Sequence, residues 1–95
     1  MERDAIFHTL RDHQTDLASR GVQSLAVFGS VARGDFSSGS DLDLLVEFNQ
    51  PIGLFEFIRL KLYLEETTGC RVDLVTPDAL HPGLRDRILE EAVNV

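Results

Sequence analysis

Apolar residues recur at helical spacing over the first twenty residues of the chain. Ile6, Leu10 and Leu17 fall on one stripe, and His13 completes it. Polar and charged residues occupy the positions between them, as in a helix that buries one face. The pattern predicts a single amphipathic helix over residues 2–20.

Three short apolar segments have the composition and period of β-strands. Val22–Phe28 is rich in strand formers and ends at a Gly-Ser pair, after which residues 31–33 are long enough for one helical turn. Residues 41–48 alternate, with apolar side chains at the even positions and carboxylates at three of the four odd positions. Val72–Val75 is the third segment. We therefore expect three strands, the second of which carries its carboxylates on one face only.

The remaining apolar segments predict two further helices. Residues 54–67 are apolar around much of a helix circumference. Residues 58, 60, 62 and 64 are all apolar, so a strand also fits the periodicity, but about fourteen residues is long for a strand. Thr76 and Pro77 have the form of a helix cap followed by proline. A last helix is expected over residues 84–93, after an interruption at Pro82 and Gly83.

The order of these elements predicts an α/β (α+β) fold, a small mixed β-sheet flanked by helices, as one domain over residues 1–95. A short connection joins the first two strands and favours an antiparallel pair. A whole helix joins the second and third strands and favours a parallel crossover. The C-terminal end of the first strand then lies beside the N-terminal ends of the other two strands, so the polar residues there converge at one edge.

Three aspartates are the candidate catalytic and metal-binding residues at that edge. Asp41 and Asp43 are two positions apart on a strand and point the same way, and Asp73 comes from the neighbouring strand. Crowded carboxylates repel one another, and a hard divalent cation such as Mg²⁺ relieves the repulsion. Two such ions stabilise the attacking and leaving oxygens of a displacement at phosphorus. The alternative for Asp41 and Asp43 is a turn residue and a solvated strand face, and the alternative for Asp73 is a charge on an edge strand.

The Gly-Ser bend supplies the candidate nucleotide-binding residues. Gly29 allows the backbone to approach a triphosphate closely, and Ser30 offers a hydroxyl and a backbone N–H. Arg33 is a candidate for neutralising the departing pyrophosphate. An ion pair between Arg33 and Asp35 on the surface is the alternative, and a simple tight turn is the alternative for Gly29 and Ser30.

Composition and net charge bear on which partners the protein binds and on where in the cell it acts. Sixteen acidic and nine basic residues give a formal net charge of −7, which makes direct binding to a nucleic-acid backbone unlikely. No apolar run approaches the roughly 20 residues that a membrane helix needs. The one cysteine, Cys70, cannot form a disulfide within the chain, and no secretory signal opens the sequence, so a cytoplasmic location is expected.

At this point the sequence resembles a known family. The string GSVARGDFSSGSDLDLLVEF, with Gly-Ser followed after ten residues by Asp-x-Asp, is similar to the signature of the minimal nucleotidyltransferases, relatives of the DNA polymerase beta superfamily. The later VDLV, with Asp73, resembles the third metal-binding carboxylate of that family. The similarity extends from about the first helix to the end of the chain.

The resemblance implies a nucleotidyltransferase that uses ATP and two Mg²⁺ ions. It also implies a setting, because these small proteins commonly act as antitoxins beside a helical HEPN-type toxin, and some transfer AMP to a tyrosine of that toxin. The expected activity is thus transfer of AMP, or another nucleotide, to a protein hydroxyl. The alternative is a non-catalytic module in which the apolar helical segment 54–64 docks on a helical toxin and neutralises it by occlusion.

Overall fold

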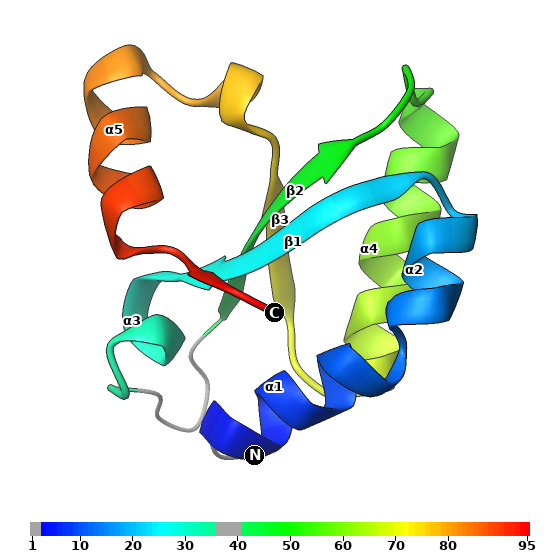
Figure 1. Ribbon diagram of the computed structural model, residues 1–95, viewed down its shortest axis with the longest axis horizontal. Helices are drawn as coiled ribbons and strands as arrows, with labels where there is room; N and C mark the ends of the chain where they lie inside the picture. The colour runs from blue at the N-terminus through cyan, green and yellow to red at the C-terminus, as the bar shows by residue number, and fades with distance from the viewer. Residues whose placement is uncertain (1–2, 36–40) are drawn as a thin grey trace.

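The protein is built around one four-stranded sheet, seen in a computed structural model that describes residues 3–35 and 41–95 (Figure 1). The strands lie in the order β3-β2-β1-β4. Their bounds are β1 Val22–Phe28, β2 Leu42–Phe48, β3 Val72–Val75 and β4 Val93–Asn94. The three expected strands are confirmed, and β4 is an addition to them. The predicted class, a small mixed sheet flanked by helices, is correct.

The pairing of the strands confirms the expectation drawn from the connection lengths. β1 is antiparallel to β2, and its last residue, Phe28, lies opposite Asp43. β2 is parallel to β3, and Asp43 lies opposite Asp73. The C-terminal end of β1 therefore lies beside the N-terminal ends of β2 and β3, which is where the candidate site residues were placed.

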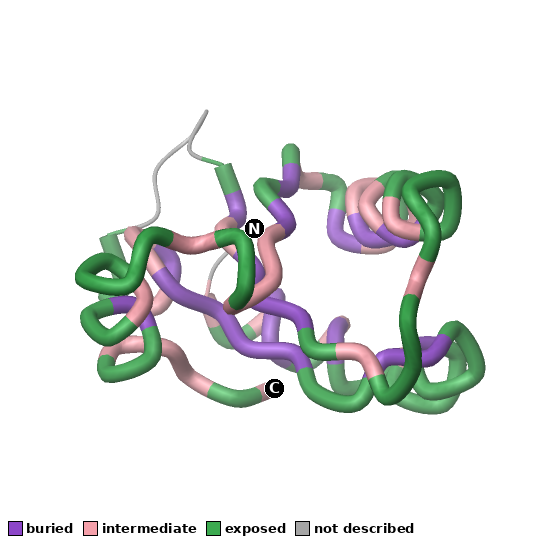
Figure 2. The backbone as a smooth tube through the Cα atoms, turned by 90° about the horizontal axis from the view of Figure 1, so that it is seen from above, coloured by how far each residue is buried: buried purple, intermediate pink, exposed green. Residues whose placement is uncertain are grey.

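One face of the sheet carries the main hydrophobic core. It is covered by three helices, α1 Arg3–Asp12, α2 Gln14–Ser19 and α4 Leu54–Thr68 (Figure 1). Buried segments follow β1 and β2 through the middle of the molecule, and most of α4 is exposed or half-buried (Figure 2). The fully buried side chains of this core include Ile6, Leu10, Leu42, Leu44, Val46, Leu60 and Leu64. The amphipathic pattern of the sequence is thus explained by burial against a single face.

The opposite face of the sheet has a much smaller core. Helix α5, Pro82–Glu91, packs there through Ile88, which joins Ala26, Phe28 and Leu45 in a separate cluster. Two short elements complete the fold, α3 Gly29–Ala32 directly after β1 and the 3₁₀ turn η1 Pro77–Ala79 after β3. The carboxylates at odd positions of β2 lie on this thinly covered face.

The expected helix over residues 2–20 is interrupted, and this prediction is wrong in detail. α1 ends at Asp12, and His13 leaves the helical region with φ −104° and ψ 15°. The His13 Nδ1 atom lies 2.8 Å from the Thr9 carbonyl oxygen, and the His13 N–H bonds to the carbonyl of Leu10, three residues back. The i→i−3 hydrogen bond tightens the end of α1, and a second helix, α2, begins at Gln14. Both helices bury a leucine in the same core, Leu10 in α1 and Leu17 in α2.

The expected helix over residues 84–93 is shifted. It begins at Pro82, which the first turn of a helix accepts, and ends at Glu91. Ala92 is extended (φ −65°, ψ 137°), and Val93 and Asn94 pair with Val27 and Ala26 of β1. The backbone groups of an otherwise uncovered strand edge favour this pairing over another helical turn.

Residues 36–40 of the predicted Gly/Ser stretch lie outside the described residues. Within the described residues, every helix is too short or too polar to cross a bilayer.

Candidate active site

Asp43 and Asp73 come together at the N-terminal ends of β2 and β3. They are register partners in a parallel pair, so both side chains project from the same face, the face that α5 covers. Asp43 is half-buried, and Asp73 is exposed. Burial first, and then the negative charges of Asp73 and Asp41, raise the pKa of the Asp43 carboxyl above its ordinary value. Two neighbouring carboxylates of this kind repel each other, which favours a bound cation.

Asp41 is close to this pair, but its carboxylate is engaged elsewhere. Arg71 donates hydrogen bonds from Nε and Nη2 to Oδ1 of Asp41, at 3.1 and 3.0 Å. Within residues 3–35 and 41–95, no three His, Cys, Asp or Glu side chains are grouped closely enough to hold a metal ion. The structure thus places two of the three predicted carboxylates opposite each other, and the third is bound to Arg71.

The bend after β1 is fitted closely around Asp43. Gly29 has φ +71°, and a Cβ atom built on it would overlap the Asp43 Oδ2 atom. Any other residue at this position would have to adopt a disfavoured backbone conformation and displace the carboxylate. Glycine is therefore required here for two independent reasons, and the Gly-Ser bend and Asp43 form one unit.

Ser30 and Arg33 follow on α3 and the residue that caps it. Ser30 is half-buried, one position after the bend. The Arg33 guanidinium lies 3.5 Å from Glu91 and 3.7 Å from Asp35, so the surface ion pair weighed as an alternative is present. Arg33 also lowers the pKa of Asp43, which indicates that its positive charge acts on the carboxylate pair. All the predicted site residues therefore lie at one edge of the sheet.

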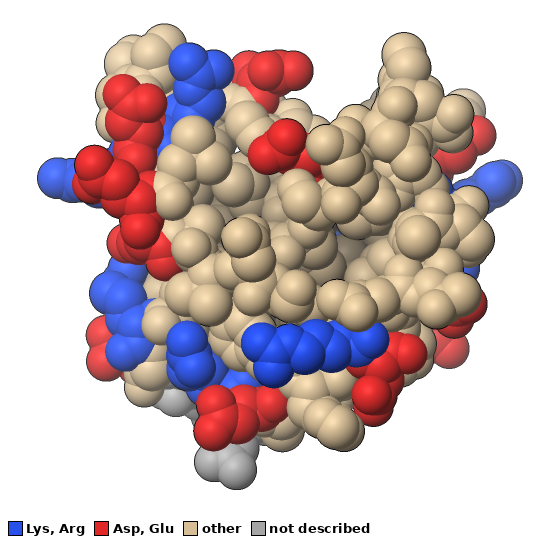
Figure 3. Space-filling view, in the orientation of Figure 1, with Lys and Arg blue, Asp and Glu red and all other residues tan. Residues whose placement is uncertain are grey.

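Glu91 is a neighbour of the site that the sequence did not reveal. Its Oε1 atom accepts a hydrogen bond of 3.0 Å from the Gly29 backbone N–H, and its charge contributes to the raised pKa of Asp43. It lies 62 positions from Gly29 along the chain, within a run of ordinary helix-end residues. No local pattern marks it, and only the packing of α5 on the sheet places it here. Acidic and basic side chains lie side by side over α3 and α5 (Figure 3).

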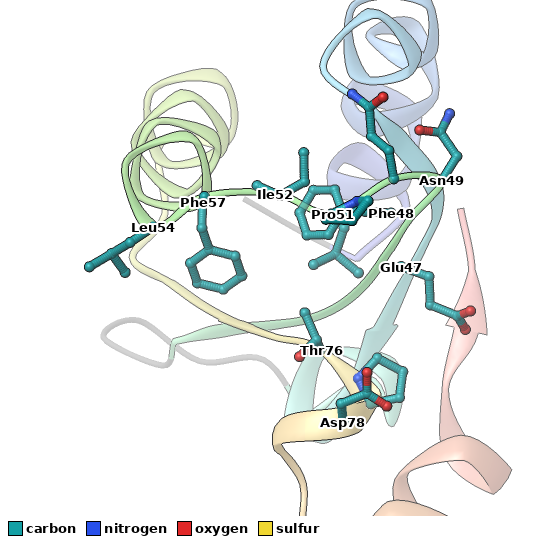
Figure 4. Close-up of a pocket in the computed structure, with 13 residues that line it drawn as sticks. Glu47, Phe48, Asn49, Pro51, Ile52, Leu54, Phe57, Thr76 and Asp78 are labelled. Atoms are coloured by element: carbon teal, nitrogen blue, oxygen red, sulfur yellow. The ribbon is translucent and has the colours of Figure 1, made fainter.

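A pocket of about 700 Å³ lies away from these residues, at the opposite ends of β2 and β3. It is lined by residues 46–54, Phe57 and residues 76–78. Figure 4 shows Phe57 extending from α4 into this space, with Thr76 and Asp78 on the other side. None of the predicted site residues lines it, so this pocket is a separate feature.

Comparison with known proteins identifies relatives of this chain. Residues 10–95 match the family described as the nucleotidyltransferase domain. The chain belongs to this family. Protein adenylyltransferase MntA of Thermococcus cleftensis is 42% identical to this nucleotidyltransferase over 87 residues, which are 90% of the chain and 88% of that protein. A Methanocaldococcus jannaschii protein, provisionally named a protein adenylyltransferase, is 47% identical over 79 residues, 83% of the chain and 85% of the relative.

Solved structures share the fold of this nucleotidyltransferase. One, described provisionally as a minimal nucleotidyltransferase, has a TM-score of 0.89 at 40% identity and covers 100% of the chain and 97% of its own. A toxin–antitoxin complex with AMP-PNP gives 0.71 at 21% identity, covering 99% and 72%. A complex of tri-AMPylated Shewanella oneidensis HEPN toxin with MNT antitoxin gives 0.60 at 19% identity, covering 97% and 66%. The last two support the fold alone.

Proposed function

We propose that this nucleotidyltransferase transfers AMP from ATP to a hydroxyl group of a HEPN-type toxin protein, with Mg²⁺ as cofactor. The observation that carries the proposal is the pairing of Asp43 with Asp73 on one face of the sheet, directly against the Gly29 bend. The names of the MntA relative and of the tri-AMPylated toxin complex support AMP as the transferred group and a HEPN toxin as the acceptor.

The residues at the site fit a hard divalent cation. Asp43 and Asp73 offer carboxylate oxygens, the ligands that Mg²⁺ prefers. The pKa of Asp43 is raised first by burial and then by the charges of Asp73 and Asp41, and a bound cation would offset both the burial of the charged form and the repulsion. Asp41 would join them by exchanging Arg71 for the ion. The Asp41–Arg71 pair is exposed, with 46% and 80% of the two side chains accessible. Breaking this ion pair to admit the metal ion therefore costs at most about 1 kcal/mol. Two ions remain the expected number.

The proposed reaction is a displacement at the α-phosphorus of ATP. The acceptor oxygen forms a bond to that phosphorus, the bond to the bridging oxygen of the β-phosphate breaks, and pyrophosphate leaves. The carboxylate of Asp73 takes the proton of the acceptor hydroxyl. Ser30 and Arg33 hold the phosphates at the bend that Gly29 makes possible. Bound Mg²⁺ would supply stabilisation of the negative charge on the attacking and leaving oxygens.

The acceptor is a protein rather than a nucleic acid in this proposal. The net charge of −7 disfavours a polyphosphate backbone. A cytoplasmic location fits the same proposal, because ATP and Mg²⁺ are available there and the single cysteine, Cys70, is free.

The test of catalysis combines the chain with Mg²⁺, ATP labelled at the α-phosphate and a helical HEPN-type protein. We expect label to appear on the partner, and to disappear when the Asp41→Asn/Asp43→Asn double variant replaces the wild type. Label transfer of equal extent by wild type and variant, or by neither, would contradict the proposal. A partner whose acceptor tyrosines are changed to phenylalanine identifies the hydroxyl.

A second candidate function, neutralisation by occlusion, is favoured by one observation. α4 exposes a stripe of large apolar side chains, Leu54 (69% accessible), Phe55 (74%), Ile58 (41%) and Leu62 (57%). Exposed apolar area of this kind is typical of a surface that meets another protein. If occlusion suffices, the Asp41→Asn/Asp43→Asn variant still protects cells from the toxin at normal expression, whereas Phe55→Asp/Ile58→Asp does not. If catalysis is required, the aspartate variant fails to protect.

A further inference from the structure

A single carboxylate contacts both ends of α3, the short segment that carries the proposed phosphate-binding residues. The Glu91 Oε1 atom accepts the hydrogen bond from Gly29, the first residue of α3. The other oxygen, Oε2, lies 3.5 Å from Nη1 of Arg33, the residue that caps α3. Ser30 lies between the two contacts. Glu91 therefore spans the segment from its start to its end.

The backbone that carries Glu91 is held on both sides. Three residues earlier, Ile88 is buried against the sheet in the smaller core, with 6% of its surface accessible. Two residues later, Val93 pairs with Val27 of β1. The Glu91 side chain therefore contacts α3 from a fixed position. Because Glu91 already holds α3, this segment loses little further conformational freedom when it binds a ligand.

We propose that Glu91 is a positioning residue of this enzyme, which holds α3 so that Ser30 and Arg33 present their polar groups to the phosphates of the nucleotide. The inference rests on the proposed function, because it takes the roles of Ser30 and Arg33 from there. Glu91 itself does not contact the nucleotide in this proposal, since a carboxylate and a phosphate repel each other. Its contribution is the preorganisation of groups that do.

The competing possibility is that the Glu91 carboxylate occupies the place of a phosphate and must withdraw before nucleotide binds. The two possibilities predict opposite effects when the side chain is removed. Truncation of a positioning residue weakens nucleotide binding, whereas truncation of a competitor strengthens it. The difference is measurable in the free protein, without a partner and without catalysis.

The experiment is calorimetric titration of the chain with AMP-PNP in the presence of Mg²⁺. We expect Glu91→Ala to raise the Kd about tenfold, because a hydrogen bond to a charged group is lost and the arginine is released. Glu91→Gln keeps an oxygen that accepts the Gly29 N–H, and we expect its Kd within about threefold of wild type. Glu90→Ala is the matched control, because Glu90 is the preceding, exposed residue of the same helix, and it should not change the Kd.

Two outcomes would overturn the proposal: Glu91→Ala binding AMP-PNP as tightly as wild type or more tightly, or Glu91→Gln binding no better than Glu91→Ala. If Glu91→Ala does not fold, Glu91→Asp decides the matter. It keeps the charge but is one methylene too short to reach Gly29, so positioning predicts weak binding, and wild-type affinity contradicts it.

Amide NMR gives a readout that is independent of nucleotide. The Gly29 amide proton is bonded to a carboxylate, so Glu91→Ala should shift its resonance upfield and speed its hydrogen exchange, while Glu91→Gln largely preserves both. An unchanged Gly29 resonance in Glu91→Ala would show that the contact does not exist in solution. In the transfer assay, the KM for ATP should rise in Glu91→Ala with the KM for the acceptor protein unchanged. If the acceptor is wrong, only this last readout is lost, so the two proposals fail separately.

Discussion

The two faces of the sheet differ in what their side chains do, and β2 displays both. Leu42, Leu44 and Val46 are fully buried against α1 and α4 in a core that has fifteen buried residues in the described part of the chain. On the other face, Leu45 belongs to a smaller cluster, with four buried residues among those described, and the half-buried Asp43 lies on the same side. Stability comes mainly from one face, which leaves the other free to carry carboxylates that no hydrophobic core would accept. Because successive side chains of β2 point to opposite faces, one face of the strand packs in the main core and the other carries the candidate site residue Asp43.

The largest effect is expected where the chemistry is proposed. Asp43→Asn should reduce transfer of AMP about 10³-fold, about 4 kcal/mol, because a group that stabilises developing charge is lost. Glu47→Gln is the matched control, an exposed acid on the same strand and the same face, and should leave the rate unchanged. Labelled-ATP transfer under identical Mg²⁺ concentrations measures both. Comparable losses in the two variants would mean that general acidity, and not this edge, matters.

Adjacent leucines of β2 test the other half of the comparison. Leu44→Ala should lower the free energy of unfolding by about 3.5 kcal/mol and Leu45→Ala by about 2 kcal/mol, since the smaller cluster collapses more easily around a cavity. Both side chains are buried, at 0% and 4% accessibility, so burial alone does not separate them. Urea unfolding with equal m-values decides the matter. Equal losses would show that the two cores contribute equally.

A smaller effect is expected at the bend that links the faces. Gly29→Ala should lower stability by about 2 kcal/mol, and it should also abolish the gain in melting temperature that Mg²⁺ with AMP-PNP produces. Gly34→Ala separates the causes, because Gly34 has φ +80° but no atom of the described residues lies within 4 Å of a Cβ built on it. It should lose only the backbone part, about 1 kcal/mol, and keep the ligand response. A ligand response lost in both variants would point to α3 as a whole.

The smallest effect concerns the pH dependence of stability without metal. The pKa of Asp43 is raised in the folded protein above its ordinary 3.8, so the folded form holds the proton more tightly than the unfolded form. The contribution of Asp43 to the free energy of unfolding is fully present below pH 3.8 and is lost as the pH rises through the pKa of Asp43 in the folded protein. With EDTA present, Asp43→Asn should therefore melt above wild type at pH 7, with the difference vanishing below pH 3.8. A variant that melts below wild type at pH 7 would contradict this.

The spacing of apolar and polar residues along the chain predicted the strands β1, β2 and β3, and connection lengths predicted their pairing, but neither predicted β4 or the break at His13. The alternation of β2 placed Asp43 on the face away from the main core, and connection lengths placed Asp73 beside it. β4 has two residues, too few to show a period, and it exists because the edge of β1 needs partners. The break at His13 depends on a hydrogen bond that no spacing reveals.

Local patterns predicted the positions of the candidate residues that lie on strands, but they did not predict contacts between distant segments. Spacing predicted that Asp41 and Asp43 share a face, but not that Arg71, thirty residues later, holds Asp41. Glu91 reaches the site only because α5 returns across the sheet. Both are side-chain contacts that become visible only once the chain is folded.

The exposed pair between Asp41 and Arg71 makes the resting protein partly self-neutralised. The arginine offsets the negative charge of Asp41 beside the Asp43–Asp73 pair. In the proposed function, an ion bound at Asp41 would displace an arginine whose side chain is 80% accessible. The guanidinium would then be free at the rim of the site, and binding of the ion would change the charge that this surface presents to the next ligand.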